Sequence, residues 1–433
     1  MDLLYANDRP GEYPDSYYSA TANRAEAFPG LDTDTECEIC VVGGGFTGLS
    51  AALHLAERGH DVVLLEAHRA GWGASGRNGG QGASGQRTSQ RVLEKLVGNR
   101  DAAHLWRLAV DAVQLVRDLV ARHHIACDLR DGVLHADLSP GDFRHTRDEV
   151  AHLRNVYGHM AVRLLERDEI AAALGTRVYY GGALDMSAAH LHPLNYALGL
   201  ASAAAAAGAR IFERSPVAEV VPGERPMVRA GAGTVNARHV VLACNGYLGG
   251  LDTEVSSRVM PINNFIVATR PLGKELAREL IRDDVAVADS KFVVNYYRLS
   301  ADNRLLFGGG ESYGYRFPAD IRSKAQRPML EVFPQLEGTE IEFAWGGTLA
   351  ITRSRMPHFA RPEAGIVSAS GYSGHGVAMA TLAGRVIADL IDGRPADFEV
   401  LESVPTPRFP GGQRLRWPLL VLAMLWFSMR DRF

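Results

Sequence analysis

The stretch that decides the fold is "CEICVVGGGFTGLSAALHLAERGHDVVLLE", residues 37–66. It begins with an apolar, β-branched run and continues through Gly43, Gly45 and Gly48 in the spacing G-x-G-x-x-G. Apolar residues then recur on one helical face, and a second strand of the buried type closes the stretch. Together these features predict a compact βαβ unit, in an α/β fold, that binds a dinucleotide.

Each glycine of the motif has a physical task. Gly43 allows the tight turn, Gly45 lets a pyrophosphate approach the backbone, and Gly48 lets helix and strand pack closely. The free N–H groups at the start of the helix then bind the diphosphate. Glu66 ends the second strand, where a carboxylate binds ribose hydroxyls and disfavours the 2′-phosphate of NADP. We therefore predict a Rossmann-like dinucleotide-binding domain.

The composition limits the class of protein. The chain has 433 residues, a net charge of −4 and 46% hydrophobic residues. This composition is typical of globular proteins, and the net charge shows none of the positive excess that nucleic-acid-binding proteins carry. Four cysteines argue against a disulfide framework and favour a reducing, cytoplasmic location. The first 35 residues lack the basic start and apolar run of a signal peptide.

The end of the chain carries a short apolar segment, "RWPLLVLAMLWFSMRDRF", residues 416–433. Its apolar part of roughly 13 residues would span about 20 Å as a helix, which is less than the hydrocarbon core of a bilayer. We expect this segment to pack on the protein itself rather than to contact a membrane.

The remaining chain alternates between helical and strand-like patterns. Helical periodicity recurs over residues 90–125 and 145–175, and residues 192–208 read as an alanine-rich helix. Residues 210–221 are typical of a strand with a Ser-Pro turn. Mixed-polarity strands between residues 258 and 345 favour a mostly antiparallel sheet.

We therefore expect a discontinuous dinucleotide-binding domain with a second domain inserted into it. The expected boundaries are residues 1–35 for an N-terminal extension, 36–85, 186–254 and 346–400 for the cofactor domain, 86–185 and 255–345 for the substrate domain, and 401–433 for the tail.

The sequence after Glu66 favours FAD over NAD. Residues 66–81, "EAHRAGWGASGRNGGQ", do not lead into another regular strand–helix repeat, as they would in an NAD dehydrogenase. Small and polar residues continue instead, and they could follow an extended ligand inward. FAD needs such a path because its flavin ring lies well beyond the ADP.

Several segments resemble one known family. Residues 41–80 resemble the D-amino-acid oxidase/glycine oxidase superfamily of FAD-dependent oxidoreductases, and within it the gamma-glutamylputrescine oxidases and their relatives. The similarity extends to "SYYSATAN", "LACNGYL", "YYRLSADNRLLFGGG", "GYSGHGVAMATLAG" and the "FPGG…DRF" tail, so it covers nearly the whole chain. It implies a Rossmann-like FAD domain of the glutathione-reductase-2 type and a substrate domain on a mostly antiparallel sheet.

The resemblance and the motif together imply the residues that hold FAD. The segment around Val217 would contribute backbone bonds to the adenine, and residues 371–376 would set a helix N-terminus against the flavin. The expected cofactor-binding residues are Gly43, Gly45, Phe46, Thr47, Gly48, Glu66, Ala67, Gly73, Ser75, Arg77, Asn78, Gly79, Gln81, Val217, Ala243, Asn245, Gly374, His375, Gly376 and Val377. The resemblance also bears on how FAD is held, because sarcosine-oxidase relatives link the flavin to a cysteine just ahead of the C-terminal glycine turn. The matching residues here, 350–365, contain no cysteine, so we expect FAD to be bound non-covalently.

The implied activity is oxidation of a C–N bond by hydride transfer from carbon to flavin N5. The flavin would then reduce O₂ to H₂O₂, and the imine would hydrolyse to aldehyde and ammonia. The implied substrate is gamma-glutamylputrescine or a related carboxylated amine of putrescine catabolism. The catalytic candidates are His375 at the helix start, Tyr297 and its neighbour Tyr296 in an aromatic wall, Arg298 as a carboxylate anchor, and Lys291 for O₂ activation.

Two other functions stay open at this point. One is an amino-acid dehydrogenase of the same superfamily that passes electrons to a membrane quinone. The other, of a different class, is a flavin-binding subunit without turnover. Cys37 and Cys40 form a C-x-x-C pattern that we interpret as core packing, and "HLHP" at residues 190–193 lacks the further ligands of a metal site.

Overall fold

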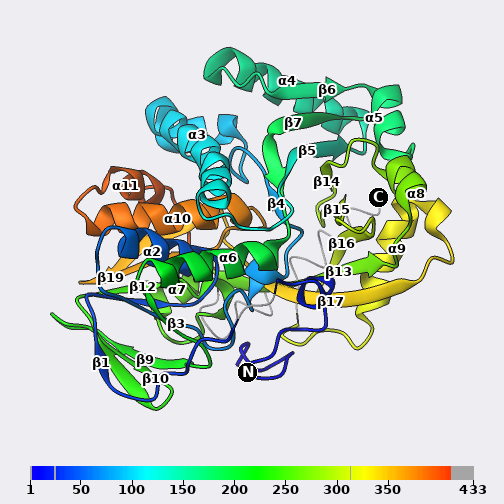
Figure 1. Cartoon of the computed structure of the whole chain (residues 1–433). Coiled ribbons are helices and arrows are strands. Elements are labelled where there is room, and N and C mark those ends of the chain that lie inside the picture. The colour runs from blue at the N-terminus through cyan, green and yellow to red at the C-terminus, as the bar shows by residue number, and fades with distance from the viewer. Residues whose placement is uncertain (1, 24–25, 313, 411–433) are drawn as a thin grey trace.

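The computed structural model describes residues 2–23, 26–312 and 314–410, and the apolar segment at residues 416–433 lies outside them (Figure 1). Two sheets lie side by side. The central sheet, on the left of Figure 1, is covered by α2, α6 and α10, and the large sheet, on the right, lies beside α8 and α9. The N-terminal segment passes beneath both sheets.

The central sheet has the strand order β18-β19-β12-β2-β3-β8. Neighbouring strands pair in parallel except β18 and β19, which pair antiparallel. All four residues of β2 and of β3 are buried, as the continuous apolar runs of the sequence require. The bounds are β2 Ile39–Val42, β3 Val62–Leu65, β8 Arg210–Phe212, β12 His239–Leu242, β18 His358–Glu363 and β19 Ile366–Ser370.

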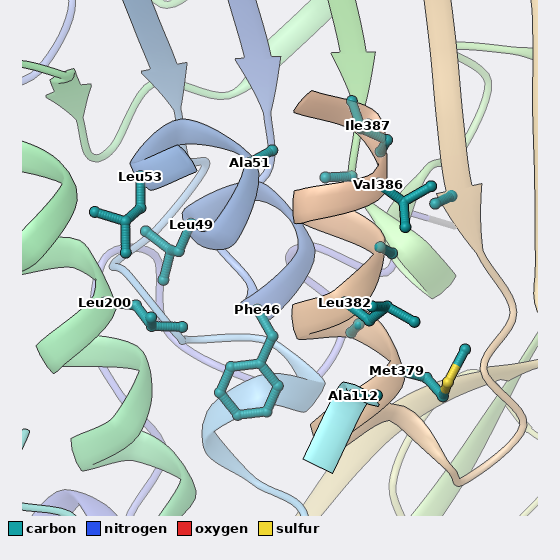
Figure 2. Packing of buried hydrophobic residues seen from close by; sticks show 14 of the residues in the cluster. Phe46, Leu49, Ala51, Leu53, Ala112, Leu200, Met379, Leu382, Val386 and Ile387 are labelled. Atoms are coloured by element: carbon teal, nitrogen blue, oxygen red, sulfur yellow. The ribbon is translucent and has the colours of Figure 1, made fainter. Parts of the chain in front are cut away.

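One helical layer covers this sheet. Leu49 and Leu53 of α2 point toward Leu200 of α6, while Ala51 points toward α10 (Figure 2). The helix α3 contributes to the same hydrophobic cluster through Ala112. The bounds are α2 Phe46–Glu57, α3 Gln90–Arg122, α6 Pro193–Ala206, α10 Gly376–Ile391 and α11 Ala396–Glu402.

The large sheet has the order β17-β13-β16-β15-β14-β5-β7-β4, with β6 paired to β7. Its second half brings strands from the early chain beside strands from residues 260–351, because β5 and β14 pair in parallel. The bounds are β4 Gln81–Gly82, β5 Arg130–Asp137, β6 Val162–Leu165, β7 Gly181–His190, β13 Met260–Thr269, β14 Ala286–Asp289, β15 Tyr296–Leu299, β16 Leu305–Ser312 and β17 Ile341–Ile351.

Smaller elements complete the fold. A small sheet has the order β1-β11-β10-β9, and short helices connect the strands of the large sheet. The bounds are β1 Thr35–Glu36, β9 Val217–Val221, β10 Met227–Ala230, β11 Gly233–Asn236, α1 Tyr17–Ala20, α4 Pro140–Tyr157, α5 Arg167–Leu174, α7 Thr253–Arg258, α8 Lys274–Leu280 and α9 Ile321–Val332.

The βαβ unit, the α/β class and the antiparallel strands between residues 258 and 345 are confirmed. The helix predicted over residues 145–175 is wrong in its middle. Gly158 ends α4 with a φ of 67°, which glycine adopts without strain, and β6 then pairs with β7 before α5 begins. Residues 210–221 form two strands in different sheets, because the Ser-Pro turn takes the chain from β8 to β9.

The domain boundaries stay a prediction. Residue 86 was expected to begin the substrate domain, yet α3, which follows it, shares the hydrophobic cluster of α2, α6 and α10. The large sheet also draws strands from residues 81–190 and 260–351. The core of the cofactor domain therefore includes a helix that the sequence pattern alone assigns to the insertion.

His192 gives a prediction about the pH dependence of stability. It caps α6, since its Nδ1 accepts the Asn195 N–H at 3.1 Å, and its Nε2 lies 3.1 Å from the Thr21 hydroxyl. Burial, followed by the charge of Arg298, lowers the pKa of His192 to about 3. The unfolded chain therefore binds a proton below a pKa of about 6.5 that the folded chain does not bind.

We expect His192→Asn to flatten the stability profile between pH 6.5 and 4. The histidine's contribution is complete above the unfolded pKa and is lost as the pH falls, by up to about 1.4 kcal/mol per pH unit. Asparagine also caps helices but does not titrate. Urea unfolding at several pH values measures the slope, with the exposed His124→Asn as control. Equal slopes for His192→Asn and wild type would contradict this prediction.

Candidate functional site

A cavity of about 720 Å³ lies between the carboxyl ends of the central strands and one face of the large sheet. In open α/β sheets, ligands bind at this edge because the strand ends and helix N-termini meet there. The central sheet contributes Val42, Gly43, Glu66 and Ala243, and the large sheet contributes Val133, His135, Ala288 and Tyr296.

The glycine motif forms a cradle at one end of the cavity. A Cβ on Gly43 would lie 2.8 Å from the Ala243 carbonyl oxygen, and one on Gly45 would lie 2.9 Å from the Ser75 hydroxyl. Gly45 is the N-cap of α2 and has no side chain to accept hydrogen bonds from the helix. The start of α2 lines the cavity through Gly45, Phe46 and Thr47, and the Phe46 N–H donates to the Ser75 hydroxyl at 2.9 Å. A helix N-terminus of this kind is where a diphosphate would bind.

Glu66 lies at the end of β3, on the wall of the same cavity. Its Oε2 accepts the Gly44 N–H at 2.7 Å and its Oε1 accepts the His68 N–H at 2.8 Å. Burial raises the pKa of Glu66 to about 7, while these N–H donors act in the opposite direction. The two hydrogen bonds fix the carboxyl group where ribose hydroxyls would meet it, which agrees with the sequence prediction.

The segment after Glu66 follows the cavity wall, but Arg77 does not project freely into the space. Arg77 Nη1 pairs with Asp8 at 2.7 Å, its Nε donates to the Trp72 carbonyl at 2.7 Å, and its guanidinium carbon lies 4.4 Å from the Trp72 ring centre. The Arg77 side chain is 1% exposed. Its observed partners are thus the N-terminal segment and Trp72, while a contact with the cofactor phosphates stays a prediction.

Asn78 and Gly79 shape the turn that follows. Asn78 Nδ2 donates to the Ala74 and Ser75 carbonyls, and its Oδ1 accepts the Gly80 N–H at 2.7 Å. A Cβ on Gly79 would lie 2.7 Å from the Tyr296 ring. The chain therefore passes directly over the large sheet at this point, and only glycine fits.

The N-terminus of α10 also lines the cavity. Gly374, His375, Gly376 and Val377 line it, and His375 is an N-cap whose side chain accepts no helical N–H. His375 Nε2 lies 3.1 Å from the Ala83 carbonyl, so this nitrogen carries the hydrogen. Burial lowers the pKa of His375 to about 4, and Arg87 acts in the same direction. His375 is therefore neutral near pH 7.

Two catalytic candidates lie outside the cavity lining. Tyr297 is 1% exposed and packs in the core beneath the large sheet, where its ring stacks on Phe307 at 5.3 Å. Arg298 points to the cavity-facing side of β15, but the glycine turn covers it, and its Nε donates to the Gly79 carbonyl at 2.9 Å. The predictions that Tyr297 contacts substrate and that Arg298 anchors a carboxylate are therefore wrong.

Lys291 does line the cavity, but its Nζ pairs with Glu331 at 3.2 Å. Gly48 lies behind the cradle, where a Cβ would lie 1.9 Å from the Gly43 carbonyl oxygen, so its part is to allow packing. The other expected cofactor residues line the cavity: Gly43, Gly45, Phe46, Thr47, Glu66, Ala67, Gly73, Ser75, Arg77, Asn78, Gly79, Gln81, Val217, Ala243, Asn245, Gly374, His375, Gly376 and Val377.

Of the two tyrosines that the sequence offered, Tyr296 and not Tyr297 lines the cavity, and its hydroxyl hydrogen-bonds Asn264. Sequence reasoning missed several other cavity residues. Arg87 and Arg355 come from loops distant in sequence, and Glu311 is the last but one residue of β16. Alternation along β15 could have separated Tyr296 from Tyr297, because successive strand residues face opposite sides of a sheet.

A search of the described residues finds no cluster of three or more His, Cys, Asp or Glu side chains arranged to hold a metal ion. None of the helices within residues 2–410, the gaps excepted, is long and apolar enough to cross a membrane.

Comparisons with known proteins agree with this geometry. A family model described as "FAD dependent oxidoreductase" matches residues 38–390. The chain is 40% identical to the gamma-glutamylputrescine oxidoreductase of Escherichia coli strain K12, over 97% of this chain and 99% of that protein. Two solved structures share the fold. One is the glycine oxidase of Geobacillus kaustophilus, with a TM-score of 0.70 and 22% identity over 83% of this chain and 95% of that one. The other is the L-proline dehydrogenase of P. horikoshii, with a TM-score of 0.66 and 20% identity over 84% of this chain and 94% of that one.

Proposed function

This chain belongs to the FAD-dependent oxidoreductase family, and on that basis we propose that it is an amine oxidase. The proposed substrate is gamma-glutamylputrescine or a related amine that carries a carboxylate. The observation that supports this best is the cavity itself, which continues from the dinucleotide cradle to an aromatic and polar face of the large sheet.

FAD is the cofactor of this family, and the residues present fit it. The glycine cradle would hold the diphosphate, and Glu66 would hold the ribose. The start of α10 would hold one edge of the flavin. When bound, the flavin supplies the hydride acceptor for the C–N bond. The positive end of α10 favours negative charge in this part of the cavity.

We propose that the flavin is bound without a covalent link. Cys244 is a cavity-lining cysteine, but it lies at the strand ends near Glu66, and its Sγ donates to the Val42 carbonyl at 3.4 Å. The segment at residues 350–365, where a covalent link would be expected from the resemblance, has no cysteine. Acid precipitation should therefore release all yellow colour into solution, and a yellow pellet would contradict this proposal.

The apolar part of the cavity lining would favour a neutral substrate amine. A primary amine with a pKa near 10 is uncharged about once in a thousand molecules at pH 7, and it must be uncharged before it gives up hydride. Lowering its pKa by about three units costs about 4 kcal/mol. Ile262, Leu349 and Ile351 are apolar residues of the cavity lining, and they would withhold water from the amine, which disfavours the charged form.

We propose O₂ as the electron acceptor, with H₂O₂, aldehyde and ammonia as products. No particular lysine is assigned to O₂ reduction, because Lys291 Nζ is held by Glu331. A dehydrogenase that uses a quinone is the competing possibility within the family. A fold shared with a solved dehydrogenase does not decide between them.

The test is anaerobic bleaching of the flavin by a panel of amines, followed by aerobic turnover. We expect gamma-glutamylputrescine to bleach the flavin faster than putrescine, glycine or L-proline. Under air, one H₂O₂ should form for each aldehyde. Bleaching by glycine or proline alone would overturn the proposed substrate. Turnover with a dye acceptor but without H₂O₂ would establish a dehydrogenase, and no bleaching by any amine would favour a non-catalytic subunit.

A further inference from the structure

One wall of the cavity is formed by the end of β5 and the first turns of α4. Successive strand residues face opposite sides of a sheet, and His135 and Asp137 both line the cavity from the same face of β5. Asp142 and Thr146, one turn apart on α4, line it as well, and we call these four residues the α4 wall. Figure 1 shows α4 at the top of the molecule, away from α2 and α10, whose first turns line the cofactor part of the cavity.

The two carboxylates of the α4 wall are brought together by Ser290, which follows β14. The Ser290 hydroxyl donates to Asp142 Oδ2 at 3.0 Å and accepts the Leu138 N–H at 3.1 Å. The Ser290 N–H donates to the Ala136 carbonyl at 3.0 Å. Asp137 lies between Ala136 and Leu138 in the chain, so Ser290 holds Asp142 beside the strand end that carries Asp137.

Asp137 carries a buried negative charge that the described residues offset only in part. Its side chain is 1% exposed, and its Oδ1 accepts the Thr146 hydroxyl at 2.9 Å and lies 3.2 Å from His135 Nε2. Its Oδ2 is buried and, within the described part of the chain, has no hydrogen-bond partner. A buried carboxylate oxygen without a donor is costly, so a cation bound beside this wall would be favoured.

The other charged groups beside the α4 wall do not provide that cation. Lys291 also lines the cavity, but its Nζ pairs with Glu331 at 3.2 Å. His135 carries a charge only when it is protonated. A third carboxylate, Asp289, already accepts the Lys291 and Asn295 N–H groups and the Asn295 amide. The search of the described residues for metal-ligating clusters finds none here, which favours an organic cation over a metal ion.

We propose that Asp137 and Asp142 form an ammonium subsite that binds the α-ammonium of the substrate's glutamyl group. This inference rests on the proposed function and adds to it the group that recognises the amino-acid end of the substrate. That ammonium lies about 12 Å from the reacting amine in an extended chain, so it needs a site away from the flavin. Asp142, which is partly exposed, would accept the ammonium N–H groups, and the buried charge of Asp137 would strengthen the attraction.

The test compares two substrates in the flavin-loaded enzyme. Gamma-glutamylputrescine carries the α-ammonium, and N-glutarylputrescine has the same carboxylate, amide and reacting amine without it. We expect Asp142→Asn to raise KM for gamma-glutamylputrescine by roughly 10- to 100-fold, as for the loss of a hydrogen bond between charged groups. Its kcat should not change, and kcat/KM for N-glutarylputrescine should stay within about twofold.

Asp137→Asn is a second variant, which keeps an oxygen for the Thr146 hydroxyl but removes the charge. It should also raise KM for gamma-glutamylputrescine alone. Asp148→Asn is the matched control, because Asp148 is exposed on the same helix and does not line the cavity. Equal losses for both substrates in Asp142→Asn and Asp137→Asn would overturn the proposal and would assign the carboxylates to the reacting amine or to the fold. Unchanged kinetics for both substrates would overturn it as well.

A binding measurement separates this proposal from the proposed function. Titration calorimetry with gamma-glutamylbutylamine, which has the glutamyl group but no reacting amine, should show binding to wild type and a loss of affinity of about tenfold or more in Asp142→Asn. If no amine reduces the flavin but this binding still depends on Asp142, the proposed function fails and the subsite stands. If gamma-glutamylputrescine is oxidised but gamma-glutamylbutylamine binds both proteins equally, the subsite fails and the function stands.

Discussion

Gly48→Ala should yield a protein that contains almost no flavin. A Cβ at this position would lie 1.9 Å from the Gly43 carbonyl oxygen and 3.1 Å from Val41 Cγ1. The first contact is with backbone, so no side-chain rotation can relieve it. The start of α2 would have to move away from β2, and the N–H groups that face the diphosphate would move with it.

The expected cost has two parts. Overpacking of this kind lowers the free energy of unfolding by about 3 kcal/mol. The displaced cradle also loses the hydrogen bonds to the diphosphate, and each 1.4 kcal/mol of lost binding weakens FAD affinity tenfold. The ratio of flavin to protein absorbance after purification, and urea unfolding of the apoprotein with and without added FAD, measure the two parts separately.

Gly250→Ala is the matched control for this experiment. Gly250 is exposed in a turn, and a Cβ there would meet no atom within 4 Å. It should keep wild-type flavin content and stability. A Gly48→Ala protein with full flavin content would show that α2 can move away from β2 without loss of FAD binding. It would contradict the prediction that close packing requires glycine at the third position of the motif.

The glycine motif could be read from sequence because its geometry is local. Gly43, Gly48 and Glu66 lie within one βαβ unit, and the spacing of strand, turn and helix places them with little help from the rest of the chain. The same is true of the helix start at residues 374–377, whose neighbours in sequence form its turn. Such local patterns made the α/β class predictable, and they account for the expected cofactor residues that line the cavity.

The substrate side could not be read in this way, because its contacts join distant segments. The sequence predicts Arg298 as a strand arginine that is available to a substrate carboxylate. In the structure, the turn at Gly79, 219 residues earlier in the chain, covers it. The loop that carries Arg87 is joined to a loop 266 residues further along the chain by the Thr88–Ser354 hydrogen bond. Neither periodicity nor motif spacing predicts contacts between such distant segments. Only the choice between Tyr296 and Tyr297 could have been made from local alternation along a strand.

Arg77→Ala should destabilise the folded protein more than the loss of one surface ion pair would. The Arg77 side chain is 1% exposed and that of its partner Asp8 is 13% exposed. Removing the guanidinium leaves the Asp8 carboxylate partly buried without its counter-charge, which costs about 3–5 kcal/mol when a buried pair is broken. It also removes the contact with the Trp72 ring, which helps form the cavity wall.

Two measurements should therefore change together. The free energy of unfolding should fall by about 3 kcal/mol, since Asp8 keeps some exposure, and FAD affinity should fall about tenfold as Trp72 loses its cation–π partner. Arg9→Ala is the control on the same segment, because the Arg9–Glu12 pair is exposed and its loss should cost under about 0.5 kcal/mol.

A double-mutant cycle distinguishes the ion pair from simple packing. Once Asp8 is replaced by Asn, removal of Arg77 no longer strands a buried charge, so the second substitution should cost less than the first. A coupling of about 1–3 kcal/mol between the two positions is expected. Additive effects would mean that Arg77 acts through Trp72 alone. An Arg77→Ala protein with wild-type stability and flavin content would show that residues 71–81 behave as a linker, and that the N-terminal segment is not held by this arginine.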